Sequence, residues 1–153
     1  MLNSLRKQTT KNFELILITE KGSLSVLRQK GLLLTRGDTV SFIDDDIYCP
    51  STWLESIFEC FREGVVGVTG PTTIKKEYQK NRDCLKWPIL RKACERFFEV
   101  SGKPGHLSPC GAPSMESNFQ ECLYEGEVQY LECCNMSLLR NEDIYVGGFD
   151  NHY

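Results

Sequence analysis

Three consecutive aspartates, Asp44–Asp46, directly follow the apolar-rich run Thr39–Ile43. This run predicts a strand, and the apolar spacing of residues 54–61, after Pro50, predicts an amphipathic helix. Neighbouring carboxylates repel one another unless cations or hydrogen-bond donors neutralise them. At the carboxyl end of a strand in an open α/β sheet, they lie where such sheets bind their ligands. This segment therefore predicts an α/β fold with an anionic site at one edge of its sheet.

The first half of the chain alternates strand and helix signals. Phe13–Thr19 is a nearly continuous apolar run, which predicts a strand buried on both faces of a parallel sheet. Leucines recur at helical spacing in residues 23–36, and Thr52 with Glu55 forms a capping-box pattern at the start of the next helix. Val65–Thr69 predicts a third strand. Because strands that alternate with helices join by right-handed crossovers, we expect an open, mostly parallel sheet with flanking helices.

The second half of the chain carries weaker signals, and one of its segments is rich in Gly, Pro and Ser. The patterns predict a helix at 88–99, a loop at 101–118, a strand at 128–133 and a helix at 140–146. A chain of 153 residues is long enough to form one core without disulfides, so we expect a single domain.

The composition argues against several classes of function. A net charge of −3 gives no general affinity for polyanions, so we expect no nucleic-acid partner. The apolar runs are only a few residues long, whereas a membrane-spanning helix needs about 20. Eight cysteines without a Cys-x-x-Cys pair favour reduced thiols in a cytoplasmic protein. The basic-rich residues 75–103 predict a solvated helix surface or, alternatively, a peripheral contact with an anionic membrane.

Two enzyme chemistries use paired aspartates at the end of a strand. A dehalogenase-like phosphatase needs an Asp-x-Asp-x-Thr/Val pattern, and Tyr48 breaks that pattern here. In nucleotide-sugar transfer, the carboxylates hold Mg²⁺ or Mn²⁺ against the diphosphate of the donor. No Walker-type loop and no Gly-x-Gly-x-x-Gly motif supports ATP hydrolysis or dinucleotide chemistry.

Six short motifs occur in a fixed order along the chain. They are Ser4–Thr9, Arg36–Asp38, Phe42–Asp46, Gly67–Pro71, Asn135–Ser137 and Gly147–Asp150. In this order the chain resembles a family 2 glycosyltransferase with the GT-A fold. The resemblance covers almost the whole chain, and the ordered set of motifs is far more specific than any one of them. It implies inverting, metal-dependent transfer of a sugar from a nucleotide-diphosphate sugar to an acceptor hydroxyl.

The resemblance assigns the donor site to the aspartate triplet, the family's metal-binding DXD motif. It implies that Asp44 and Asp45 bind the nucleotide sugar, and that Asp46, together with Asp44, holds Mg²⁺ or Mn²⁺. The Asp that contacts the base in the family is replaced by Glu20 in this sequence. A UDP-sugar is the expected donor.

The resemblance places Asn135 and Met136 on the acceptor side. The acceptor is expected to be a saccharide or a lipid-linked molecule, in a role such as polysaccharide biosynthesis. The family's usual catalytic base would lie beyond Tyr153, which leaves Asp150 as a weak candidate for the base.

The resemblance implies one partial glycosyltransferase domain over residues 1–153, truncated at both ends. Its nucleotide-binding half would be 1–71 and its acceptor-side half 72–153. The family's first strand would precede Met1, and its absence would leave an open, apolar sheet edge. The alternative is a non-catalytic, truncated remnant that binds nucleotide or is inactive.

Overall fold

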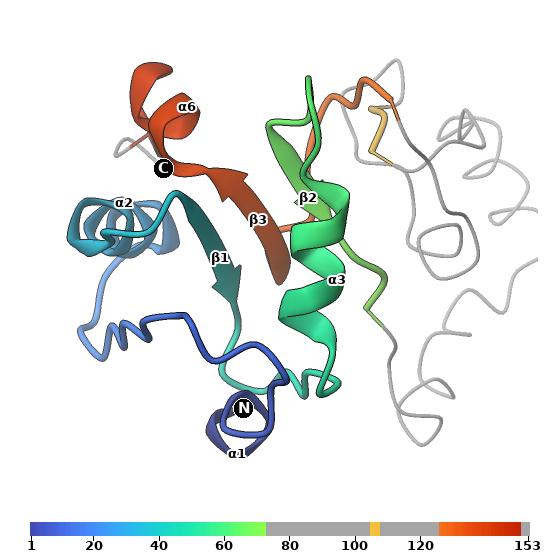
Figure 1. Cartoon of the computed structure of the whole chain (residues 1–153). Helices are drawn as coiled ribbons and strands as arrows, with labels where there is room; N and C mark the ends of the chain where they lie inside the picture. Colours follow the sequence, from blue (N-terminus) through green and yellow to red (C-terminus); the bar gives the residue numbers. More distant parts are fainter. Residues whose placement is uncertain (73–104, 108–125, 151–153) are drawn as a thin grey trace, which may run out of the picture. The chain divides into compact units, whose positions relative to one another are not determined.

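The computed structural model describes residues 1–72, 105–107 and 126–150 of the chain. The chain divides into two compact units, Gly70–Glu132 and a unit that combines Met1–Thr69 with Cys133–Tyr153. All the elements below belong to the second of these. They are α1 (Leu2–Leu5), α2 (Leu24–Leu34), β1 (Thr39–Ile43), α3 (Trp53–Cys60), β2 (Gly67–Thr69), β3 (Asn135–Leu139) and α6 (Arg140–Tyr145) (Figure 1).

The three described strands form a sheet in the order β1-β3-β2. β3 runs antiparallel to both neighbours, with Ser137 opposite Ser41 of β1 and opposite Val68 of β2. The expectation of a mostly parallel sheet is therefore wrong for the described residues. The physical reason is that β3, from far along the chain, lies between two strands that run in the same direction. β1 and β2 therefore hydrogen-bond to β3 and not to each other.

The segment Phe13–Thr19 is extended, but it is not a strand, so that prediction is also wrong. Its only recorded backbone hydrogen bond within the described residues joins Phe13 N to Lys11 O, at 3.0 Å. Without a neighbouring ladder, Phe13, Leu15 and Leu17 remain 38%, 47% and 53% exposed. An apolar run becomes a strand only where another backbone supplies its hydrogen-bond partners, and among the described strands β1 pairs with β3 alone.

Most of the other predicted elements that fall on described residues form. α2, β1, α3 and β2 lie within the predicted segments, and α6 ends just before Gly147 as expected. The strand predicted at 128–133 is wrong, because the strand begins later, at Asn135. The helix predicted at 88–99 and most of the loop at 101–118 lie outside the described residues.

Within the described part of the chain, no helix is long and apolar enough to cross a membrane.

The two faces of the sheet carry different contacts. Side chains alternate along a strand, so Phe42 and its partner Met136 share one face while Ser41 and Ser137 share the other. On the first face, α2 packs against Phe42, because a Cβ at Gly31 would lie in ordinary van der Waals contact with Phe42 Cε1, at 4.0 Å. On the second face, the hydroxyls of Ser41 and Ser137 lie 2.8 Å apart and Ser137 is buried. Helix packing thus covers the strand that precedes the aspartates.

A buried glutamine connects α1 to the start of α3. Gln8 is 1% exposed, and its Nε2 donates to Pro50 O at 2.6 Å and to Ser4 O at 3.2 Å. Its Oε1 accepts from the backbone N–H of Leu54 at 3.0 Å. One side chain thus satisfies three backbone groups and fixes the chain that follows the aspartates.

The predicted capping box does not form at the start of α3. The side chain of Thr52 makes no cap hydrogen bond, and Glu55 instead accepts from Thr9 Oγ1 at 3.0 Å. Gln8 supplies the acceptor for Leu54 N, one of the helix N–H groups that lack an intrahelical partner. A distant residue therefore replaces the local cap.

Replacing Gln8 with alanine should destabilise the protein strongly, because Leu54 N and Pro50 O lose their partner in a buried place. We expect the Gln8→Ala variant to lose about 2 to 3 kcal/mol of unfolding free energy in urea titrations. Lys7→Ala, which truncates the exposed neighbour, should change stability by less than about 0.5 kcal/mol. Equal effects of the two variants would contradict a structural role for the Gln8 hydrogen bonds.

Candidate functional site

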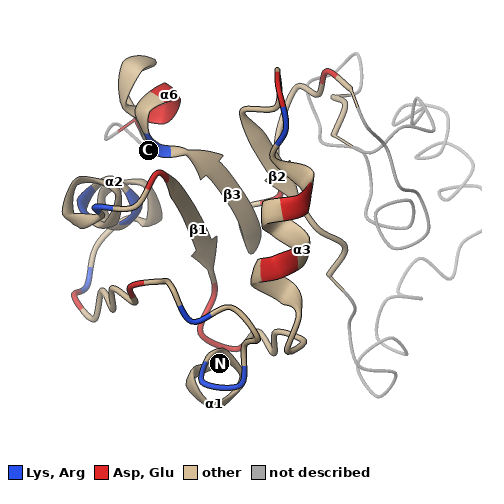
Figure 2. Ribbon diagram, viewed as in Figure 1, with Lys and Arg blue, Asp and Glu red and all other residues tan. Residues whose placement is uncertain are grey.

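The aspartate triplet forms the turn in which β1 ends. Asp44 directly follows the strand, and Ile47 N donates to Asp44 O at 3.3 Å across the turn. All three side chains are exposed, and Figure 2 shows the acidic segment at the end of β1. Within the described residues, Asp45 and Asp46 make no hydrogen bond or ion pair. Their carboxylate oxygens are therefore available to a ligand.

Among the described residues, Arg28 of α2 forms an ion pair with Asp44 of the triplet. Its guanidinium lies 3.8 Å from Asp44 Oδ1, and its side chain is only 15% exposed, against 47% for Asp44. A pair with one exposed member contributes little to stability. Arg28 matters instead for what it can bind. A guanidinium has five N–H donors, and a single carboxylate at this distance leaves most of them available to an anion.

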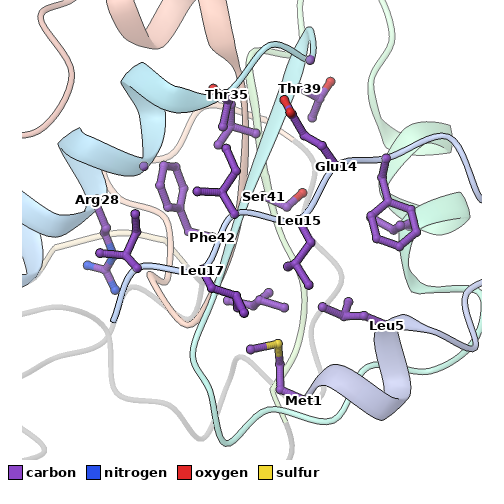
Figure 3. A pocket seen from close by; sticks show the side chains of 18 of the residues that line it. Met1, Leu5, Glu14, Leu15, Leu17, Arg28, Thr35, Thr39, Ser41 and Phe42 are labelled. Atoms are coloured by element: carbon purple, nitrogen blue, oxygen red, sulfur yellow. The ribbon is translucent and has the colours of Figure 1, made fainter. Parts of the chain in front are cut away.

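An open cavity of about 1370 Å³ adjoins the triplet (Figure 3). Its walls come from the extended segment at 12–19, α2, β1 with the aspartate turn, and residues of α1 and α3. The acidic turn lies at the carboxyl end of β1, and Asp38 lines the cavity before the opposite end of that strand.

The functional position of Arg28 was not predicted from the sequence, although a signal was present. Leu24, Leu27, Arg28 and Gly31 line the cavity at i, i+3, i+4 and i+7 of one helix. A charged residue within an otherwise apolar stripe of this spacing faces the same side as the stripe.

Glu20 lies away from the cavity walls. It is exposed and forms an ion pair with Lys30 of α2, whereas its neighbour Thr19 does line the cavity. The contact with a nucleotide base that was predicted for Glu20 stays a prediction.

The two residues assigned to the acceptor side point to opposite faces of the sheet. Asn135 lies opposite Ile43, the residue before Asp44, and its Oδ1 accepts from Trp53 Nε1 at 3.0 Å. Met136 is buried opposite Phe42. β3 therefore brings Asn135 next to the aspartate turn and directs Met136 into the core.

Asp150 follows the glycine turn that ends α6 and is exposed. The turn is fixed by its neighbour Phe149, whose ring packs edge-on against Phe42 with centroids 5.1 Å apart. Phe149 N also donates to Gln29 Oε1 at 2.8 Å, next to Arg28 on α2. α2 thus carries both the partner of the aspartates and the anchor of the segment that bears Asp150.

Two groups near the site have perturbed ionisation. The backbone N–H and the guanidinium of Arg36 hold the pKa of Glu14, on the cavity wall, below its usual value. Burial raises the pKa of the Cys49 thiol, three residues after Asp46 in the chain. Glu14 is therefore a fixed anion that holds the extended segment, and Cys49 is a protonated, unreactive thiol.

The carboxylate oxygens of the turn are suited to a cation that a bound ligand also coordinates. Among the described residues, no three His, Cys, Asp or Glu side chains converge on one point to hold a metal ion alone. Mg²⁺ and Mn²⁺ commonly take only one or two protein carboxylates and complete their shell with phosphate oxygens and water. The exposed, unpaired carboxylates of Asp45 and Asp46 and the weakly paired Asp44 are suited to that role.

Residues 1–117 match the model of the family described as Glycosyl transferase family 2. Comparisons with curated proteins and with solved structures find no match to the chain.

The two glycines before Phe149 provide a matched pair of variants. Both have positive φ, but a Cβ would collide with the Gln29 carboxamide at Gly148 and would meet nothing at Gly147. We expect Gly147→Ala to cost about 1 kcal/mol of unfolding free energy and Gly148→Ala at least about twice that. In a Gln29→Ala background the two costs should become equal, as measured by a double-mutant cycle in urea. Additive costs would show that Gln29 does not hold this turn.

Proposed function

Because this chain belongs to glycosyl transferase family 2, whose members transfer a glycosyl group from an activated sugar, we propose that the aspartate turn is its donor site. The observation that carries the proposal is the position of Asp44–Asp46. These three residues directly follow β1 and line the cavity, and Arg28 lies 3.8 Å from Asp44. We propose a UDP-sugar as the donor and a hydroxyl of a saccharide or lipid-linked molecule as the acceptor.

In the proposed donor complex, Asp46 and Asp44 hold Mg²⁺ or Mn²⁺, and Asp45 contacts the nucleotide sugar. The cation would neutralise the charge that develops on the departing nucleoside diphosphate. Arg28 supports the same role, because its free N–H donors lie beside the turn and suit phosphate oxygens. Positive charge from two sources would thus surround a diphosphate that the carboxylates alone would repel.

The proposed reaction is a single inverting displacement. An acceptor hydroxyl oxygen bonds to the anomeric carbon while the bond from that carbon to the diphosphate oxygen breaks. The proton of the hydroxyl passes to a carboxylate, and among the described residues Asp150 is our candidate for this base. Asn135 lies beside the turn and would orient the acceptor, held in place by its hydrogen bond from Trp53.

Calorimetric titration of UDP into the purified chain, with and without Mn²⁺, tests the donor site. We expect binding that requires Mn²⁺ and that Asp46→Ala weakens at least tenfold. Asp38→Ala is the matched control, because it removes an exposed carboxylate at the opposite end of the same strand and should leave the Kd within about twofold. A cooperatively folded chain that binds no UDP would contradict the proposal and favour the non-catalytic remnant.

The diphosphate contact of Arg28 can be tested separately. We expect Arg28→Gln to raise the Kd of UDP at least tenfold while the Kd of uridine, which has no phosphate, stays within about twofold. Arg28→Lys should fall between the wild type and Arg28→Gln, because an ammonium keeps the charge but loses the planar fork. An equal loss of UDP and uridine binding would show that Arg28 acts only through the fold.

A further inference from the structure

Two adjacent cysteines form the turn that leads into β3. Cys133 and Cys134 are both thiols, and Cys133 is exposed whereas Cys134 is half-buried. Both residues lie in the turn and not in the strand, which begins at Asn135. Within a strand, successive side chains point to opposite faces, and a turn does not impose this alternation. The cysteine turn, Cys133–Cys134, therefore holds two neighbouring thiols, one of them open to solvent.

The cysteine turn lies at the same end of the sheet as the aspartate turn. β1 and β3 run antiparallel, and Asn135, the first residue of β3, lies opposite Ile43, the last residue of β1 (Figure 1). Cys134 precedes this pair on one strand, and Asp44 follows it on the other. A change in the backbone of the cysteine turn therefore acts on the pair that fixes where the aspartates begin.

Contacts with three elements hold Asn135 in place. Its Oδ1 accepts from Trp53 Nε1 of α3, and its backbone O accepts from Thr69 Oγ1 of β2, both at 3.0 Å. Its backbone also belongs to the ladder with β1. A new restraint on the peptide unit before Asn135 must distort that unit or loosen some of these contacts. The chemical state of the cysteine turn is therefore coupled to the geometry at the end of β1.

We propose that the cysteine turn is a site of reversible oxidation by a peroxide, at which a disulfide between Cys133 and Cys134 loosens the end of β1 and weakens donor binding. The effect on donor binding rests on the proposed function, whereas the oxidation and the loosening do not. The exposed carboxylates of Asp44–Asp46 favour an uncharged oxidant, because they repel an anionic one such as oxidised glutathione.

The oxidation takes two steps, and the exposed thiol reacts first. The thiolate of Cys133 attacks one oxygen of hydrogen peroxide, the O–O bond breaks, and the departing hydroxide takes up the thiol proton to form water. The product is a sulfenic acid. The sulfur of Cys134 then attacks the sulfur of Cys133, the S–O bond breaks, and the hydroxyl leaves with the proton of Cys134 as a second water. The two thiols lose two electrons, and the peroxide is reduced to two waters.

The disulfide between neighbouring residues is strained, and this strain makes the oxidation reversible. Consecutive Cα atoms are about 3.8 Å apart, whereas disulfide-bonded residues usually have Cα atoms about 4.4 to 6.8 Å apart. The turn must therefore distort to close the bond, and a strained bond is more easily reduced. Strained or exposed disulfides are the labile and regulatory ones. The same distortion acts on Asn135, which follows directly in the chain.

Mass spectrometry of the full chain after treatment with hydrogen peroxide tests the site. A protease that cleaves after glutamate releases residues 133–142, which contain only these two cysteines. We expect this peptide to lose two hydrogen atoms and to resist alkylation, and to regain both thiols in dithiothreitol. A disulfide to another cysteine, or a sulfinic acid on Cys133 in place of the disulfide, would overturn the proposal.

Single-cysteine variants test the order of the two steps. Cys134→Ser should leave a sulfenic acid on Cys133 that dimedone traps, whereas Cys133→Ser should slow oxidation of the remaining thiol at least tenfold. Cys60→Ser is the matched control, because Cys60 is exposed but its neighbours in the sequence are Glu59 and Phe61. This control should form the disulfide as the wild type does, and its failure to do so would contradict the assignment.

Hydrogen exchange and calorimetry test the effect on the site. In the oxidised chain we expect amide hydrogens near the pair of Ile43 and Asn135 to exchange at least tenfold faster. We expect the Kd of UDP with Mn²⁺ to rise at least fivefold, and both changes to reverse on reduction. The double variant with Cys133→Ser and Cys134→Ser should show neither change. Equal changes in the double variant would assign them to other cysteines and overturn the proposal.

The readouts separate this proposal from the proposed function. Unchanged exchange in the oxidised chain would overturn the loosening of β1, and faster exchange with an unchanged Kd of UDP would overturn the control of donor binding. A chain that forms the disulfide and shows the faster exchange, but binds no UDP even when reduced, would support the oxidation site and contradict the proposed function.

Discussion

The ladder between β3 and its two neighbours is the interaction on which the rest of the site depends. It joins residues as far apart as Ser41 and Ser137, 96 positions along the chain. Closing a loop of this length costs conformational entropy before any contact forms, so the ladder and the part-buried pair of serine hydroxyls must compensate for that cost. In return, the pairing of Ile43 with Asn135 fixes where β1 ends. The aspartates follow at that point, which is why their position is determined by a strand from the other end of the chain.

Features that depend on local spacing could be predicted from the sequence. β1, α2, α3 and α6 follow from apolar periodicity and glycine stops, and the aspartate turn follows from its position after a strand. The role of Phe13–Thr19 could not be predicted, because its own side chains do not specify which backbone it would pair with. The same limit applies to β3, whose direction and place between β1 and β2 leave no trace in its composition.

The site shows the same division between local and distant determinants. The carboxylates were recognisable because they are adjacent in the sequence. Arg28 was not, because its relation to Asp44 arises from the packing of α2 beside β1. The cap of α3 is a further example, since the local pattern at Thr52 gives way to a hydrogen bond that Leu54 N donates to Gln8. Residue type shows what a side chain can bind, whereas tertiary packing decides which partner it has.

The electrostatics of the turn explain why its support comes from neutral groups. Among the described residues, Arg28 is the cation that pairs with the triplet, 3.8 Å from Asp44, and like charges as close as these three carboxylates repel one another. A closer set of cations would relieve this repulsion, but it would also occupy the oxygens that a ligand needs. Uncharged hydrogen bonds with the side chains of Gln8 and Ser4 instead hold the backbone at Cys49, Pro50 and Leu54, just beyond the turn. The fold thus holds the acidic groups in place, and a cation bound there would gain free energy by relieving their repulsion.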